Sequence, residues 1–235
     1  MQLPHSNQTI SIASTAQGLP IELTCIGTGE LPVLLIGGVH GNESEGFLFA
    51  ERLQKELLTD ETALHPGLRL YICPRLNPDG CQRLRRTNQN NVDLNRNLPT
   101  KDWQSDFENV KYYPGPSAGS ELESRITLDM VQAIQPACII SLHSYENAMI
   151  NYNGPCLALA ERMSSFCGLP PKGDIGYPTP GSLGTWAGWE RQIPTITLEV
   201  LRGQEPDAVW SQHRTGVLKA IEFYLDHPRP ASSYH

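Results

Sequence analysis

Hydrophobic positions along the chain gather in short runs, separated by longer stretches in which apolar residues recur with helical spacing. Runs of strand length lie at residues 21–26, 33–36, 68–73, 137–142 and 195–200. One apolar stripe with helical spacing comprises Phe47, Ala50, Leu53, Leu57 and Leu58. Short buried strands that alternate with helices predict a three-layer α/β/α fold around a mixed, largely parallel central sheet.

Two further segments carry helical signals. The sequence "SELESRITLDMVQAI" places Ser120 and Glu123 at capping-box spacing, and its apolar residues repeat every fourth position. The C-terminal "PDAVWSQHRTGVLKAIEFYL" predicts a helix that ends before Pro228. The polar segments 77–119 and 168–184 are rich in Gly, Pro and Asn. Loops of that length in a compact domain are usually functional or disordered.

The composition is that of a soluble globular protein, with 39% hydrophobic and 18% charged residues in a chain of 235. We expect one domain over residues 1–235, because no linker, repeat or low-complexity tract divides the chain. A net charge of −7 argues against a nucleic-acid partner. No apolar run approaches the ~18–20 residues of a membrane span, and the N-terminus lacks signal-peptide features. Six cysteines without C-x-x-C spacing predict reduced, mostly buried thiols and a cytoplasmic location.

Ionisable residues stand at the ends of three predicted strands. His40 and Glu43 follow the 33–36 strand in "HGNE", His143 follows the 137–142 strand, and Glu199 ends the run in "PTITLEV". Because ligands in open α/β sheets gather beyond the carboxyl ends of the strands, these side chains should share one edge. Two imidazoles and a carboxylate are the ligand set of a catalytic zinc, and a further carboxylate could accept a proton from its water. Each motif alone also fits a tight turn or a hydrogen-bonded histidine.

The segment "PRLNPDGCQRLRRTNQNNVDLNRNLPT" places several arginines among asparagines with little periodicity. A solvated basic loop is one interpretation. However, "VDLNRN" embeds Arg96 between two asparagines in a partly apolar stretch. Guanidinium groups bind carboxylates bidentately, so this loop is typical of a site for an anionic, carboxylate-bearing ligand.

These motifs together resemble the zinc metallocarboxypeptidase family, which has H-x-x-E, a later N-R pair, a third histidine and a distal glutamate. Here they are His40–Glu43, Asn95-Arg96, His143 and Glu199, in the same order. "NPDG", "VDLNRN" and "PTPGSLGTW" are most similar to the bacterial murein tripeptide amidase branch. That branch is cytoplasmic and cleaves the bond between the side-chain carboxyl of D-glutamate and meso-diaminopimelate. The resemblance implies a zinc carboxypeptidase-like fold and a small peptide substrate with a free carboxylate.

The resemblance also implies a role for individual residues. His40, Glu43 and His143 would bind one zinc ion, and Glu199 would be the general base. Asn95 and Arg96 would hold the terminal carboxylate of the substrate, and Arg86 would polarise the scissile carbonyl, with Arg85 as the alternative. Further substrate-binding candidates from the same resemblance are Tyr177, Ser182 and Leu183. The charge of the 180–190 loop does not indicate which side chain the substrate carries.

Two other functions remain open from the sequence. Succinylglutamate desuccinylases and aspartoacylases look similar around "HGNE" and "DLNR" and hydrolyse small acylated amino acids. They usually carry an additional β-rich domain, whereas the residues after Glu199 here look mostly helical. A relative that binds peptides without cutting them would usually lack a metal ligand or the distal glutamate, and this sequence has all of them. The oligomeric state is not indicated.

Overall fold

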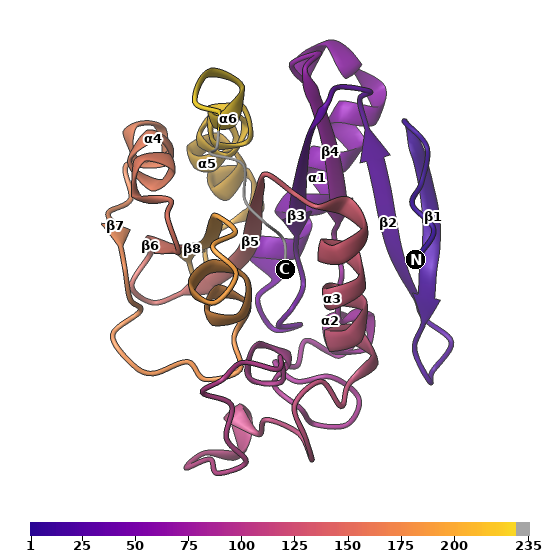
Figure 1. Cartoon of the computed structure of the whole chain (residues 1–235), viewed down its shortest axis with the longest axis vertical. Helices are drawn as coiled ribbons and strands as arrows, with labels where there is room; N and C mark the ends of the chain where they lie inside the picture. The colour runs from indigo at the N-terminus through magenta and orange to yellow at the C-terminus, as the bar shows by residue number, and fades with distance from the viewer. Residues whose placement is uncertain (229–235) are drawn as a thin grey trace.

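The structure is a computed structural model that describes residues 1–228, and its centre is one twisted eight-stranded sheet (Figure 1). The strands lie in the order β1-β2-β4-β3-β5-β8-β6-β7. Their bounds are β1 (Gln8–Ser14), β2 (Pro20–Ile26), β3 (Leu31–Ile36), β4 (Leu68–Cys73), β5 (Cys138–Tyr145), β6 (Met149–Asn153), β7 (Pro171–Lys172) and β8 (Thr195–Leu201). The central strands β4, β3, β5 and β8 are parallel, and antiparallel pairs flank them on both sides.

Helices connect the parallel strands. The α-helices are α1 (Ser44–Thr59), α2 (Pro78–Arg83), α3 (Leu122–Ile134), α4 (Leu157–Cys167), α5 (Pro206–Ile221) and α6 (Phe223–Asp226). Shorter helical turns are η1 (Glu61–Ala63), η2 (Leu94–Arg96), η3 (Val110–Tyr112) and the π-helix η4 (Gly184–Trp189). None of the helices within residues 1–228 is long and apolar enough to cross a membrane.

Two hydrophobic cores lie on the two faces of the sheet. One contains apolar residues of α1, α4 and α5, and the other contains apolar residues of α3 and η4. Figure 1 shows α3 in front of the sheet and α1 behind it. These layers confirm the predicted three-layer fold, with one core for each sheet face. Below, we refer to the α1 face and the α3 face of the sheet.

All five predicted strands are present, with ends shifted by a few residues. The stripe on α1 is also buried, except that Leu58 is 36% exposed. The predicted C-terminal helix is interrupted at Glu222, where α5 ends and α6 follows. All six cysteines lie in the described part of the chain, are buried and form no disulfide, as predicted from their spacing.

The predicted capping box at the start of α3 is wrong. The helix begins at Leu122 with Glu121 as its N-cap, so Ser120 lies one residue too early to cap it. The Ser120 hydroxyl instead donates to the Glu121 carboxylate over 2.7 Å. Asn88 binds the Glu123 carboxylate over 3.2 Å, and therefore that side chain does not reach back to the cap.

Candidate active site

The carboxyl ends of β3, β5 and β8 bring the predicted metal ligands together. His40 follows β3, Glu43 directly precedes α1, and His143 lies within β5. Glu43 Oε1 is 3.0 Å from His40 Nδ1, and Glu43 Oε2 is 2.8 Å from His143 Nδ1. The two Nδ1 atoms are 3.2 Å apart. These three buried side chains are the one group in residues 1–228 whose ligand atoms converge within 4.8 Å.

Outer hydrogen bonds orient both imidazoles. His40 Nε2 is 3.0 Å from Asp93 Oδ1, and His143 Nε2 is 3.0 Å from Ser141 Oγ. Each ring therefore has its Nε2 occupied and turns its Nδ1 toward Glu43. Metal-ligating histidines usually have such a partner on the other ring nitrogen, which fixes the ring and its tautomer. The donor set and its orientation fit a zinc ion.

Asp93 is a site residue that the sequence interpretation missed, although it lies inside the motif "VDLNRN". Its side chain is fully buried and also accepts hydrogen bonds from Arg86. Burial acts to raise the pKa of the Asp93 carboxyl, but Arg86 and His40 hold that pKa well below its ordinary value. Asp93 is thus an anion that links the arginine-rich loop to the histidine.

A close contact between two turns fixes the position of His40. A Cβ atom at Gly41 would lie 1.9 Å from the carbonyl carbon of Gly80, so only glycine fits there. Gly80 N–H donates to Asn77 Oδ1 over 2.9 Å, and Asn77 Nδ2 donates to the Val39 carbonyl over 3.3 Å. The motif "NPDG" therefore packs against the "HGNE" turn and fixes its backbone.

Glu199 stands beside the histidine ligand. It is the register partner of His143 across the β5–β8 pair, and it is 6% exposed. Burial, together with the neighbouring Glu43 charge, raises the pKa of the Glu199 carboxyl to about 7, although His143 and Arg86 act to lower it. A carboxylate with a pKa near 7 can take up and release a proton at neutral pH.

The two tandem arginines lie in different surroundings. Arg86 Nη2 is 2.9 Å from Asp93 Oδ2, and its Nη1 donates to Glu43 Oε1 over 3.3 Å. Its side chain is only 18% exposed. Arg85 is exposed, and its guanidinium donates to the side chain of Asn91. The structure therefore brings Arg86, and not Arg85, to the metal-ligand group.

The N-R pair is held by the 178–183 loop. Asn95 Oδ1 accepts a hydrogen bond from the Leu183 N–H over 2.9 Å. Arg96 is buried, and its Nη1 donates to the Asn95 carbonyl over 2.7 Å. A Cβ at Gly181 would lie 2.1 Å from the Arg96 carbonyl oxygen, and Gly181 has φ +72°. Only glycine permits this approach, which places the 178–183 loop against the arginine backbone.

The remaining candidates lie in or beside the same loop. Tyr177 is half-buried, with its ring between those of Tyr112 and Tyr145 at centroid distances of 6.4 and 6.5 Å. The Ser182 hydroxyl accepts from the Thr185 N–H over 3.2 Å. The Leu183 side chain packs into the core of the α3 face, so Leu183 presents its backbone to the N-R pair.

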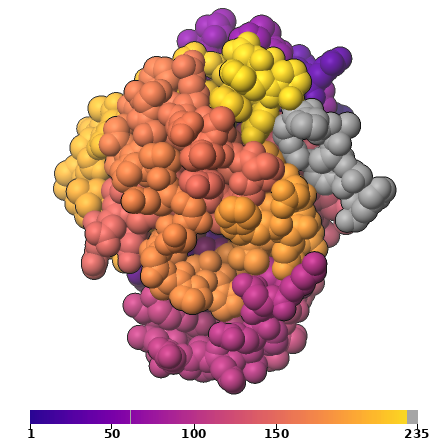
Figure 2. Space-filling view, turned by 60° about the vertical axis from the view of Figure 1, so that its left-hand side comes forward, coloured from indigo at the N-terminus to yellow at the C-terminus, as the bar shows by residue number. Residues whose placement is uncertain are grey.

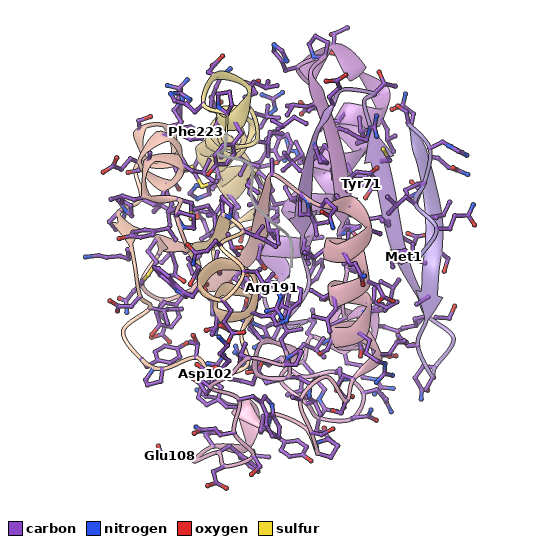
Figure 3. All side chains as sticks on the ribbon, in the orientation of Figure 1. Met1, Tyr71, Asp102, Glu108, Arg191 and Phe223 are labelled. Carbon is purple, nitrogen blue, oxygen red and sulfur yellow. The ribbon has the colours of Figure 1, made fainter. Side chains whose placement is uncertain are left out.

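A hollow of about 550 Å³ adjoins these residues. Its lining includes Arg96, Tyr112 and Tyr177, and also the carboxylates of Asp106 and Glu108. Figure 2 shows the surface hollowed between the orange 170–190 segment and the magenta segment near residue 100, with purple atoms at its floor. Figure 3 shows Glu108 at the lower end of the molecule, on the same side as Asp102. The hollow provides space for a ligand next to Arg96.

Arg202 is a second site residue that the sequence interpretation missed, and unlike Asp93 it lies in no motif. It follows β8, and its Nη2 lies 2.9 Å from Glu43 Oε1. The same nitrogen donates to the Ser144 carbonyl over 2.7 Å. No local pattern indicates this contact, because the side chain crosses from the end of one strand to the end of another.

Comparison with known proteins agrees with this arrangement. The zinc carboxypeptidase family model matches residues 1–165. The chain therefore belongs to the zinc carboxypeptidase family, and it is a zinc-dependent hydrolase.

Among individual proteins, the chain is similar to murein peptide amidases. The chain is 33% identical to murein peptide amidase A of Escherichia coli K12 over 184 residues, which cover 71% of this chain and 69% of that protein. It is 31% identical to murein peptide amidase A of Vibrio campbellii over 179 residues, or 71% and 68% of the two chains. The structure of the murein-tripeptide amidase from E. coli O157 matches with a TM-score of 0.71 and 26% identity, over 97% of this chain and 95% of that one.

Proposed function

We propose that this protein is an amidase that hydrolyses the bond between the γ-carboxyl of D-glutamate and meso-diaminopimelate in murein tripeptide. The convergence of His40, Glu43 and His143 beside a second buried carboxylate, that of Glu199, is the observation that carries this proposal. The similarity to two murein peptide amidases supports the choice of substrate.

The three converging side chains would hold the zinc ion, with Asp93 and Ser141 orienting the rings. When bound, zinc supplies Lewis-acid activation of water and of the scissile carbonyl. Glu199 would take a proton from the attacking water and pass it to the amide nitrogen as the C–N bond breaks. The Arg86 guanidinium would donate to the carbonyl oxygen as negative charge develops there, so it stabilises the transition state more than the substrate.

The remaining residues would bind the leaving part of the substrate. Asn95 and Arg96 would hold the carboxylate of diaminopimelate, and Tyr177 would close over it from the side of the hollow. The diaminopimelate side chain also carries an ammonium group. Asp106 and Glu108 line the hollow and suit that cation, which shares its carbon with the second carboxylate of diaminopimelate.

The competing functions have less support. The two relatives compared above are murein peptide amidases rather than deacylases of small acylated amino acids. A protein that only binds peptides would not need a buried carboxylate beside the metal ligands. We also propose that residues 1–235 act as a single catalytic domain in the cytoplasm, supported by the one continuous sheet and by six cysteines that form no disulfide.

The test is hydrolysis of a defined set of substrates by the zinc-loaded protein, followed by mass spectrometry. The set contains L-Ala-γ-D-Glu-meso-diaminopimelate, the same peptide with L-lysine at its C-terminus, N-succinylglutamate and N-acetylaspartate. We expect release of free diaminopimelate from the first, cleavage of the lysine peptide as well because lysine keeps the side-chain ammonium, and no cleavage of the acylated amino acids. Cleavage of an acylated amino acid without cleavage of the tripeptide would refute the proposal.

A further inference from the structure

Arg202 lies at the site on the side opposite to the Asn95-Arg96 pair. Residues on either side of that pair, Leu94 and Leu98, pack into the core of the α3 face. Arg202 instead leads into α5, whose apolar residues pack on the α1 face. The next residue, Gly203, donates its N–H to the Glu45 carboxylate of α1 over 2.6 Å. The two groups therefore approach the metal ligands from opposite faces of the sheet.

The Arg202 guanidinium is held in place but still open to a ligand. Its Nη2 donates to the Ser144 carbonyl over 2.7 Å, and its Nε lies 3.4 Å from Ser144 Oγ. These contacts anchor the side chain independently of Glu43. The side chain is 39% exposed, and Nη1 has no hydrogen-bond partner within residues 1–228. A guanidinium with an open edge next to a reaction centre is suited to bind a carboxylate.

A substrate whose scissile amide lies at the metal ligands would extend its amine residue toward the α3 face of the sheet and its acyl residue toward the α1 face. If Asn95 and Arg96 hold the carboxylate of the leaving residue, the acyl residue must extend toward Arg202. This step rests on the proposed function. In a γ-linked D-glutamyl amide, the free α-carboxylate lies four carbon–carbon bonds from the scissile carbonyl, or about 5 Å when extended. Arg202 Nη2 lies 2.9 Å from an oxygen of the metal-ligand group, so a carboxylate about 5 Å from a carbonyl bound there would be within reach of its guanidinium.

We infer that Arg202 binds the free α-carboxylate of the acyl residue and thereby selects γ-linked glutamyl substrates. An ordinary α-linked peptide has no carboxylate at that distance from its scissile carbonyl unless its side chain is acidic. Arg202 would thus act on the acyl half of the substrate, whereas Arg96 acts on the amine half. The alternative is a structural role in which Arg202 only balances the Glu43 charge. The experiment must distinguish this role from binding of the substrate carboxylate.

The test compares two substrates that differ in one group. These are L-Ala-γ-D-Glu-meso-diaminopimelate and the same peptide with its D-glutamate α-carboxylate converted to a carboxamide. The wild type, Arg202→Gln and Arg202→Lys are assayed as full chains loaded with zinc, and zinc content is measured for each. Arg52→Gln is the matched control, because Arg52 is an exposed arginine of α1 that pairs with Asp207 over 2.6 Å.

We expect the wild type and Arg52→Gln to have a kcat/KM about 10- to 100-fold higher for the carboxylate substrate, as for loss of one charged hydrogen-bonded pair. Arg202→Gln should lose this preference with its zinc content unchanged, and Arg202→Lys should retain part of it. Arg202→Gln that slows both substrates equally, or that keeps the wild-type preference, overturns the inference alone. Hydrolysis of neither substrate by the wild type overturns the proposed function and the inference together.

Discussion

Replacement of Arg86 with glutamine tests which of two neighbouring arginines polarises the scissile carbonyl, because the sequence left Arg85 as an alternative. Arg86 contacts two buried carboxylates, Asp93 and Glu43, and is 18% exposed. Arg85 is exposed, and its guanidinium donates to the neutral side chain of Asn91. Because water screens little of the Arg86 charge, loss of this donor should cost about 3–4 kcal/mol in the transition state. That energy corresponds to about a 10²–10³-fold lower kcat.

Arg85→Gln is the matched variant, and its kcat should stay within about twofold of the wild type. Steady-state kinetics on murein tripeptide give kcat and KM for both variants, and metal analysis shows whether zinc is retained. Arg86→Gln also leaves Asp93 with one partner fewer, so unfolding should be followed in parallel. Arg86→Lys should recover part of kcat only, since an ammonium lacks the planar fork. An Arg85→Gln variant that is slower than a folded, zinc-loaded Arg86→Gln would refute the assignment.

Three further changes have defined outcomes. Glu199→Gln should lower kcat about 10²–10⁴-fold and keep its zinc, because Glu199 is not one of the three converging ligands; an unchanged kcat would contradict its role as a base. Asp93→Asn should weaken zinc binding about 10–100-fold in a chelator titration, as for other lost partners of a histidine ligand, and unchanged affinity would count against Asp93 as the orienting group. Burial lowers the pKa of His213 to about 4, below 6.5 in the unfolded chain, so the unfolded state takes up the proton first as pH falls. His213 should therefore contribute a drop of about 2 kcal/mol in the free energy of unfolding between pH 7.5 and pH 5, measured in denaturant titrations as the difference in pH dependence between the wild type and His213→Leu.

The layers of the fold could be predicted because the central strands are buried on both faces. Strand β3 and its parallel neighbours are continuous apolar runs, which the sequence makes visible. The outer strands β1 and β6 were missed because they lack a continuous apolar run. Strand β1 is largely exposed and has polar residues, and β6 contains two asparagines, so neither has the signal of a buried strand. Helix α4 was missed although its buried residues recur with helical spacing.

The positions of both histidine ligands and of Glu199 could also be predicted, because each follows or ends an apolar strand. His40, His143 and Glu199 follow or end runs that must be parallel neighbours, and parallel strands present their carboxyl ends at one edge. Asp93 could have been found from the same motif as Arg96, since a carboxylate in a buried, arginine-rich loop needs a partner. The sequence favoured Arg86 but left Arg85 open as the alternative, because the choice depends on which way the chain turns after α2.

Arg202 shows where prediction from local pattern ends. Its backbone position follows from β8, but its function depends on a long side chain that ends beside residues of β5 and of the turn before α1. The Glu43 carboxylate receives Arg86 and Arg202 on the same oxygen, so two positive charges meet there. An anionic substrate with carboxylates on both sides of its scissile bond matches this distribution of charge. A substrate with a carboxylate on the amine side only would leave Arg202 without a ligand, and therefore the acyl half of the substrate should be acidic.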